Sequence, residues 1–303
     1  MSVGNKMLKN LIFIILALSS CYSFSTDSND ELFDGERSLE HIRAQVEFGP
    51  RTISNPRARE HTLKYIEDNL SRLTTKITRQ PFSAYGLEGI NIWATFVGHR
   101  DRTNKSRLML GAHWDTRPIS EKDSDPSKQD IPTSGANDGA SGVAMLLELA
   151  RIFSLNPPPV TIDLVFFDLE DMGNIDGLPF AIGAREFVKR NQFYRPSGGI
   201  ILDMVCDKDL VIPRELYSKK NAVDLMDHIW SIAKKQNAQS FLDKDGTFIT
   251  DDHLPFLEVG IPVVDLIHYP FPYYWHTSED TVDKCSSNSL KQVGDVIYAL
   301  VYG

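Results

Sequence analysis

The sequence predicts an α/β fold, a single domain whose mixed, mostly parallel central sheet is flanked by helices on both faces. Two observations favour this fold class. From about residue 106 onward, short apolar runs typical of strands alternate with longer segments whose apolar residues recur at helical spacing, which is the pattern of strand–helix–strand units. The chain also has 303 residues, of which 42% are hydrophobic, and this is enough for one large core.

The first part of the chain supplies two helices and two strands. Apolar residues at helical spacing predict helices over residues 38–48 and 57–73. Alternating or continuous apolar residues predict strands over residues 75–82 and 91–98. After residue 36 no linker or internal repeat interrupts the pattern, so we expect one domain.

Strands and helices then alternate as far as the C-terminus. The predicted strands cover residues 106–113, 160–167, 198–205 and 262–269, and the predicted helices cover residues 139–153, 183–191, 222–236 and 288–302. In sheets of this kind, ligands bind beyond the C-terminal ends of the central strands. Functional side chains are therefore expected where the strands end.

The N-terminus is typical of an export signal. Lys6 and Lys9 precede the apolar run 11–18, which is too short to span a bilayer as a helix. The small residues before Cys21 resemble a bacterial lipoprotein signal, in which this cysteine carries the lipid. Cleavage of an ordinary secretory signal near Ser25 is the alternative.

These features predict three segments, which are a signal peptide over residues 1–20, a flexible tether over 21–36 and a catalytic domain over 37–303. The polar composition of the second segment favours flexibility. The protein is expected to be exported, either as a periplasmic or cell-envelope lipoprotein or as a secreted protein. A lipid on Cys21 would be its single membrane contact.

Charge and cysteine content narrow the function further. The net charge is −9 and the pI is about 5.4, which argues against nucleic acid as a partner. Besides Cys21 the chain contains Cys206 and Cys285, without a CxxC pair. Nothing in the sequence brings these two cysteines together, so free thiols are the default interpretation and a disulfide stays open.

Acidic residues and histidines stand where the predicted strands end. They are His113, Asp115, Asp138 before a predicted helix, Glu170, Asp171, Asp203, the run Asp251–Asp252–His253, and His276. Taken singly, Asp138 could cap a helix, Asp203 could cap a turn, and the histidines could be hydrogen-bonded structural residues. Their recurrence at one edge of the sheet indicates a common site instead.

The chemistry of this set suits a metal ion. Glu170 and Asp171 are adjacent at the end of an apolar strand, and two such carboxylates repel each other unless a cation lies beside them. Carboxylates and imidazoles without thiolates are typical of Zn²⁺ in an open, catalytic site. The phosphate-binding motifs GxxxxGK[ST] and GxGxxG and the nucleophile motif GxSxG are absent from the sequence.

Six segments occur in an order that resembles a known superfamily. They are GAHWDTRP, GANDGASGVAMLLELAR, FFDLED, LDMV, DDHLPFLEVGIPV and WHTSEDT. In this order they resemble the zinc aminopeptidase superfamily, which also contains the glutaminyl cyclases of the animal type. The resemblance covers nearly all of residues 40–303, and it implies a zinc aminopeptidase-like fold that acts on the N-termini of peptides or proteins.

The resemblance also implies a role for each strand-end residue. One zinc ion is expected on Asp138, Asp171 and His276, with Glu170 as the proton shuttle. Asp203 and Asp251 are expected to form a hydrogen-bonded carboxylate network beside it. In the aminopeptidase alternative, a second zinc ion adds His113 and Asp203 as ligands.

Three features resemble the cyclases more than the aminopeptidases. Asp251 stands where many aminopeptidases have Ser, the segment LDMVCDKDLVIPRE resembles bacterial cyclase-like proteins, and YPFPYYWHT resembles the cyclase pattern around the last ligand. The last pattern makes Phe271 and Trp275 walls of a glutamine pocket, although both could also be core residues.

Three features give no support to the cyclase branch or differ from the animal cyclases. The SEDT segment is equally similar to aminopeptidases, Phe180 is the sole aromatic residue in a loop where animal cyclases have Trp, and Asp171 replaces their usual Glu. On balance we expect a glutaminyl-peptide cyclotransferase that converts N-terminal Gln to pyroglutamate and releases ammonia. A di-zinc aminopeptidase is the alternative. A third hypothesis is a catalytically inactive binding module, which the intact acid pair disfavours.

Overall fold

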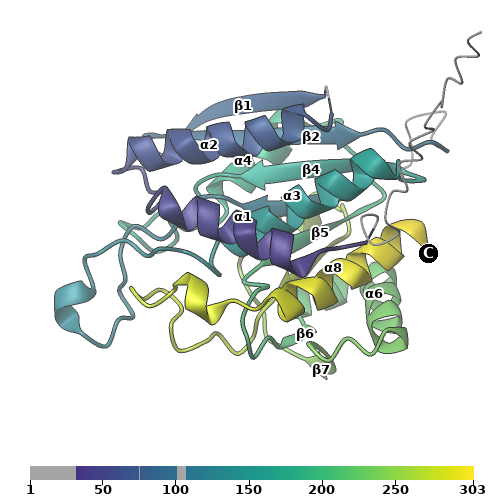
Figure 1. The fold of residues 1–303 in the computed structure, drawn as a ribbon. Coiled ribbons are helices and arrows are strands. Elements are labelled where there is room, and N and C mark those ends of the chain that lie inside the picture. Colours follow the sequence, from purple (N-terminus) through teal and green to yellow (C-terminus); the bar gives the residue numbers. More distant parts are fainter. Residues whose placement is uncertain (1–31, 75, 101–106) are drawn as a thin grey trace, which may run out of the picture.

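The computed structural model describes residues 32–74, 76–100 and 107–303 (Figure 1). The predicted signal peptide, Cys21 and residues 22–31 of the predicted tether lie outside these ranges. A six-stranded sheet forms the centre, in the order β1 (Ile77–Ala84), β2 (Leu87–Phe96), β4 (Thr161–Phe167), β3 (Arg107–His113), β5 (Gly198–Asp203) and β8 (Val263–Ile267). Strands β4, β3, β5 and β8 are mutually parallel, β2 pairs antiparallel with β4, and β1 pairs antiparallel with β2. The predicted fold class is confirmed.

Helices cover both faces of this sheet (Figure 1). One face carries α1 (Gly35–Glu47), α2 (Pro56–Ser71), α3 (Ala140–Leu155), α6 (Val223–Lys235) and α8 (Ser287–Tyr302), and the other carries α4 (Ile182–Arg190) and α7 (Leu254–Glu258). The sequence of β4 explains this arrangement, because side chains alternate across a strand. Leu164 and Phe166 pack into the core under α3, whereas Val165 and Phe167 pack against α4 and α7.

Several short elements were not predicted. They are α5 (Leu216–Asn221), α7, the 3₁₀ turns Pro126–Lys128 and Val282–Lys284, and the two-stranded parallel sheet of β6 (Ile212–Arg214) and β7 (Phe241–Asp245). Most side chains of β7 are exposed, so its sequence carries no apolar pattern that would reveal a strand.

The folded domain begins earlier than the predicted boundary at residue 37. Phe33 is buried against Gly294 of α8, and Asp34 accepts hydrogen bonds from the backbone N–H groups of Glu36 and Arg37 as the N-cap of α1. Residues 33–36 therefore belong to the domain and not to the tether. In the described part of the chain, no helix combines the length and the apolar character needed to cross a bilayer.

Candidate functional site

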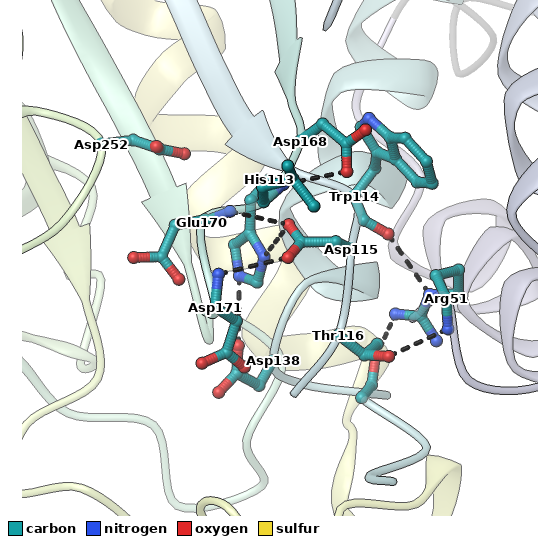
Figure 2. A network of polar contacts seen from close by, with 12 residues as sticks. Arg51, His113, Trp114, Asp115, Thr116, Asp138, Asp168, Glu170, Asp171 and Asp252 are labelled. Atoms are coloured by element: carbon teal, nitrogen blue, oxygen red, sulfur yellow. Dashed lines mark hydrogen bonds and ion pairs between the residues drawn. The ribbon is translucent and has the colours of Figure 1, made fainter. Parts of the chain in front are cut away.

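The predicted site residues converge at the C-terminal edge of the parallel strands. His113 ends β3, Asp203 ends β5, and Glu170 and Asp171 follow β4. Asp138 precedes α3, and loops before α7 and after β8 bring Asp251 and His276. All of these side chains are at least nine-tenths buried. Figure 2 shows how the carboxylates of Asp138 and Asp171 lie next to each other below His113.

The three residues predicted to hold one zinc ion form a compact group. Their ligand atoms lie within 4.8 Å of one another. Nε2 of His276 is 3.3 Å from Oδ1 of Asp171 and 3.7 Å from Oδ2 of Asp138. Oδ2 of Asp171 is buried without a hydrogen-bond partner. Two carboxylate oxygens and one imidazole nitrogen at this spacing fit a zinc ion with an open position.

A second group shares Asp138 with the first. Nε2 of His113 is 3.1 Å from Oδ1 of Asp138 and 3.2 Å from Oδ1 of Asp203. Asp138 thus directs one oxygen toward each histidine. It is not the N-cap of α3, since that position belongs to Gly139 and carries no side-chain cap. Asp203 likewise faces His113 and does not cap a turn.

Backbone hydrogen bonds fix the acid pair and the shared aspartate. Asp115 accepts the N–H groups of Glu170 at 3.1 Å and of Asp171 at 3.2 Å (Figure 2). Asp280 accepts the N–H groups of Asn137 at 2.8 Å and of Asp138 at 3.0 Å. Buried carboxylates that accept two amide hydrogens are held in one orientation. The loops of the site are therefore anchored by Asp115 and Asp280, which are not among the predicted ligands.

Glycine is required where α3 approaches the site. Gly139 has a φ of +99°, and a Cβ there would lie 2.5 Å from the carbonyl oxygen of Asp115. At Gly142 a Cβ would lie 2.1 Å from the carbonyl oxygen of Leu202 on β5. The NDGASG segment thus allows the start of α3 to lie close against the strand ends.

A buried cation neutralises part of the acidic charge. Nη1 of Arg117 donates to the carboxylate of Asp171 at 3.3 Å and to the carbonyl oxygen of Gly173 at 2.8 Å. Its other nitrogens donate to Glu121, which in turn lies 2.8 Å from Nδ1 of His276. A carboxylate behind a metal-ligating histidine fixes the tautomer and the ring orientation. Arg117 and Glu121 were not predicted, since they lie in a loop without periodic pattern.

The remaining acids of the site have raised pKa values. Burial raises the pKa of Glu170 well above its usual range, and the neighbouring Asp251 raises it further. Burial also raises the pKa of Asp203 to about 7, against the hydrogen bond from His113. Burial raises the pKa of Asp251 as well. A carboxyl group with a raised pKa is a stronger base than an exposed one, as a proton-transferring residue requires.

The last histidine responds to the same charges. Burial alone would lower the pKa of His276, but Asp171 and Glu121 raise it to about 9.

Behind Asp251, His253 lies between two carboxylates, 3.2 Å from Glu215 and 3.4 Å from Asp265. His253 therefore lies among buried carboxylates beside the site, and it forms with Asp251 and Asp265 a further group whose ligand atoms lie within 4.8 Å of one another.

A pocket of about 180 Å³ opens onto these groups. Its apolar wall is formed by Phe180, Met204, Phe248, Ile249, Ile267, Phe271 and Trp275. The ring centroids of Phe271 and Trp275 are 4.0 Å apart, with the ring planes tilted by 31°. Both rings also pack against a small core cluster around Ile249 and Ile267. The two predicted wall residues therefore line the pocket and contribute to packing at the same time. Phe248 was not singled out from the sequence.

The two cysteines beyond the N-terminal segment are bonded, which corrects the default interpretation as free thiols. Cys206 and Cys285 form a disulfide with an S–S distance of 2.05 Å across 79 residues. The bond joins the loop after β5, which follows Asp203, to the segment after His276. The sequence could not reveal this pairing, because only the fold brings the two residues together.

Comparisons with known proteins agree with this geometry. Residues 91–301 match peptidase family M28. The chain is 34% identical to a glutaminyl cyclase from Bacteroides thetaiotaomicron, with a TM-score of 0.83 and coverage of 90% of this chain and 98% of the other. It is 33% identical to a Zn-dependent exopeptidase from Parabacteroides distasonis, with a TM-score of 0.82 and coverage of 90% and 99%.

A more distant relative comes from an animal. The chain is 24% identical over 296 residues to the glutaminyl-peptide cyclotransferase of Bos taurus, across 84% of this chain and 78% of the relative. Solved structures of similar identity thus include both a cyclase and an exopeptidase. Since the matched residues cover most of the domain, the chain belongs to peptidase family M28.

Proposed function

We propose that this chain is a zinc-dependent glutaminyl-peptide cyclotransferase, which converts the N-terminal Gln of peptides to pyroglutamate and releases ammonia. The observation that carries the proposal is the small pocket whose lining combines the aromatic rings of Phe271 and Trp275 with several buried acids, Glu170 among them. Its volume of about 180 Å³ is below the range of roughly 300 to 1,000 Å³ of sites for drug-sized ligands. Such a pocket suits one side chain held in a folded conformation.

A zinc ion on Asp138, Asp171 and His276 would supply the Lewis acidity that polarises the side-chain carbonyl of the substrate. Glu170 accepts a proton from the attacking α-amine as the new C–N bond forms. It then delivers this proton to the leaving nitrogen, the old C–N bond breaks, and ammonia departs. A single carboxylate could not both bind the metal ion and transfer the proton, since a carboxylate bound to a metal ion is a poor base.

Asp203 and Asp251 assist the proton transfer through their charge. Asp251 is the largest charged contributor to the raised pKa of Glu170, and Asp251 and Asp138 both raise that of Asp203. The group therefore titrates as a unit. Phe271 and Trp275 exclude water and hold the glutamine side chain near the amine, which replaces an entropically unfavourable ring closure by a positioned one.

A di-zinc aminopeptidase is the second candidate. The observation that favours it is the group of His113, Asp138 and Asp203, whose ligand atoms also lie within 4.8 Å of one another. In that case Glu170 would serve as the general base for a water molecule. The likeness to an exopeptidase structure supports this candidate at the same level of identity.

Mass spectrometry of a peptide that begins with Gln separates the two candidates. The proposal expects loss of one ammonia from the intact peptide, whereas removal of the first residue would refute it. In the variant Glu170→Gln, we expect turnover to disappear while zinc remains bound. Retained turnover would contradict the shuttle role of Glu170.

We also propose that the protein is exported. A disulfide between Cys206 and Cys285 suits an oxidising compartment, in agreement with the predicted signal peptide. Cell fractionation and the mass of the mature N-terminus test this proposal. A lipid on Cys21 should place the protein in the membrane fraction, and Cys21→Ala should release it, whereas an unprocessed cytoplasmic protein would contradict export.

A further inference from the structure

We infer that the substrates are peptides in which the N-terminal Gln is followed by an aromatic or other large apolar residue, and that Phe248 is the surface that selects this second residue. The inference rests on the proposed cyclase function. It goes beyond that function because it assigns a binding role to the residues at the mouth of the pocket. The residues that carry out the reaction lie at the floor.

Charged and uncharged residues occupy different parts of the pocket lining. Its ionisable residues are all buried, namely Asp138, Glu170, Asp171, Asp203, Asp251 and His276. Its exposed residues are Phe248 and Thr250, which carry no charge. The floor therefore serves the reaction, and the mouth offers apolar and hydroxyl groups alone.

The position of the reacting Gln determines which residue of the substrate lies at the mouth of the pocket. The α-amine of the substrate must reach Glu170, and its side-chain carbonyl must reach the group of Asp138, Asp171 and His276. Both are on the floor, so the first residue fills the pocket. The next Cα atom is about 3.8 Å further along the chain, so the second side chain emerges at the exposed rim.

The ring of Phe248 is exposed at this rim and held in place by its neighbours. It is 57% exposed, and its ring lies 4.7 Å from that of Tyr217 at an angle of 60°. The backbone on either side is tied down, since Leu216 N–H donates to the carbonyl oxygen of Thr247 at 3.0 Å and Ile249 N–H donates to Glu215 at 3.1 Å. An exposed ring that is already held loses little entropy when a second ring packs against it.

A charged second residue has less to gain at the mouth. None of the exposed lining residues carries an opposite charge, so a charged side chain forms no ion pair with them and keeps its hydration at the rim. The strongest rival is Lys122, whose ammonium lies 3.2 Å from the centroid of the Trp275 ring and could attract an acidic second residue. That ammonium is already engaged with the ring and is adjacent in sequence to Glu121, which weakens its attraction.

Release of ammonia from four peptides tests the inference. The peptides are Gln-Phe-Ala, Gln-Gly-Ala, Gln-Glu-Ala and Gln-Lys-Ala, with the intact, zinc-loaded enzyme. We expect kcat/KM for Gln-Phe-Ala to exceed that for Gln-Gly-Ala by about tenfold. Phe248→Ala should lose about this factor on Gln-Phe-Ala through KM, with kcat nearly unchanged and with less than about a twofold effect on Gln-Gly-Ala.

Two variants serve as controls. Phe248→Tyr keeps the ring and should keep the preference. Phe193→Ala removes a Phe that is 99% exposed and lines a different surface cleft, so it should leave all four peptides unaffected. Equal turnover of Gln-Phe-Ala and Gln-Gly-Ala, a preference for Gln-Glu-Ala, or a uniform loss in Phe248→Ala would overturn the inference. Failure to release ammonia from any of the peptides would instead refute the proposed function, and the inference with it.

Discussion

Replacing Arg117 by Met should destabilise the protein by several kilocalories per mole. The guanidinium is 4% exposed, its partner Asp171 is 2% exposed, and the two are 3.3 Å apart. Removing one member of a buried ion pair leaves the other charge without compensation, at a cost of about 3 to 5 kcal/mol. Here the carboxylate left behind already stands among several other acids, so water cannot easily replace the lost partner. The Met side chain preserves most of the apolar stem and so isolates the effect of the charge.

Urea unfolding of chelator-treated protein at pH 7, followed by tryptophan fluorescence, measures this loss. With a dependence near 3 kcal/mol per molar urea, the midpoint should fall by about 1 to 2 M. The matched control is Arg185→Met, because Arg185 pairs with Glu258 at 3.3 Å with side chains 33% and 58% exposed. Such a pair contributes less than about 1 kcal/mol. The reasoning is refuted if Arg117→Met loses no more stability than this control.

Three further outcomes are expected. Glu121→Gln should weaken zinc binding by about tenfold, measured in competition with a chelator. Asp125 is an exposed acid of the same loop, and Asp125→Asn should leave the zinc affinity unchanged. Equal zinc affinities in both variants would show that Glu121 does not support the site. Replacing Cys206 and Cys285 by Ser should lower the free energy of unfolding by about 4.5 kcal/mol, from the entropy of closing a loop of 79 residues, and an unchanged urea midpoint would count against it. Burial and a nearby Arg lower the pKa of His41 to about 4, so the folded state resists its protonation and stability is lost as the pH falls from about 6.5 toward 4. Between pH 7 and pH 5 the wild type should lose about 2 kcal/mol more than His41→Gln, and equal losses in urea titrations would exclude this contribution.

The strands and most of the helices could be predicted because their side chains face a large core. β3, β4, β5 and β8 bury nearly every residue, so their apolar runs are continuous. The same rule explains what could not be predicted. β7 is largely exposed, and α5 and α7 are too short for a helical period to be recognised.

The site residues divide in a similar way. Residues at strand ends, such as Glu170 and Asp203, could be found because the fold class directs attention to that edge. Arg117, Glu121 and Phe248 come from irregular loops, and their roles depend on contacts across long stretches of sequence. The roles of such residues become visible when the loops are folded.

The shared position of Asp138 couples the two candidate metal groups thermodynamically. One of its oxygens faces His113 and the other faces His276, so a dication in one group withdraws negative charge from the other and repels a second dication. Filling the first group would therefore lower the affinity of the second, and we expect zinc to bind with negative cooperativity. The stoichiometry of the isolated protein then depends on the free zinc concentration. Metal content should accordingly be measured as a titration in buffered zinc, in which two widely separated steps are expected.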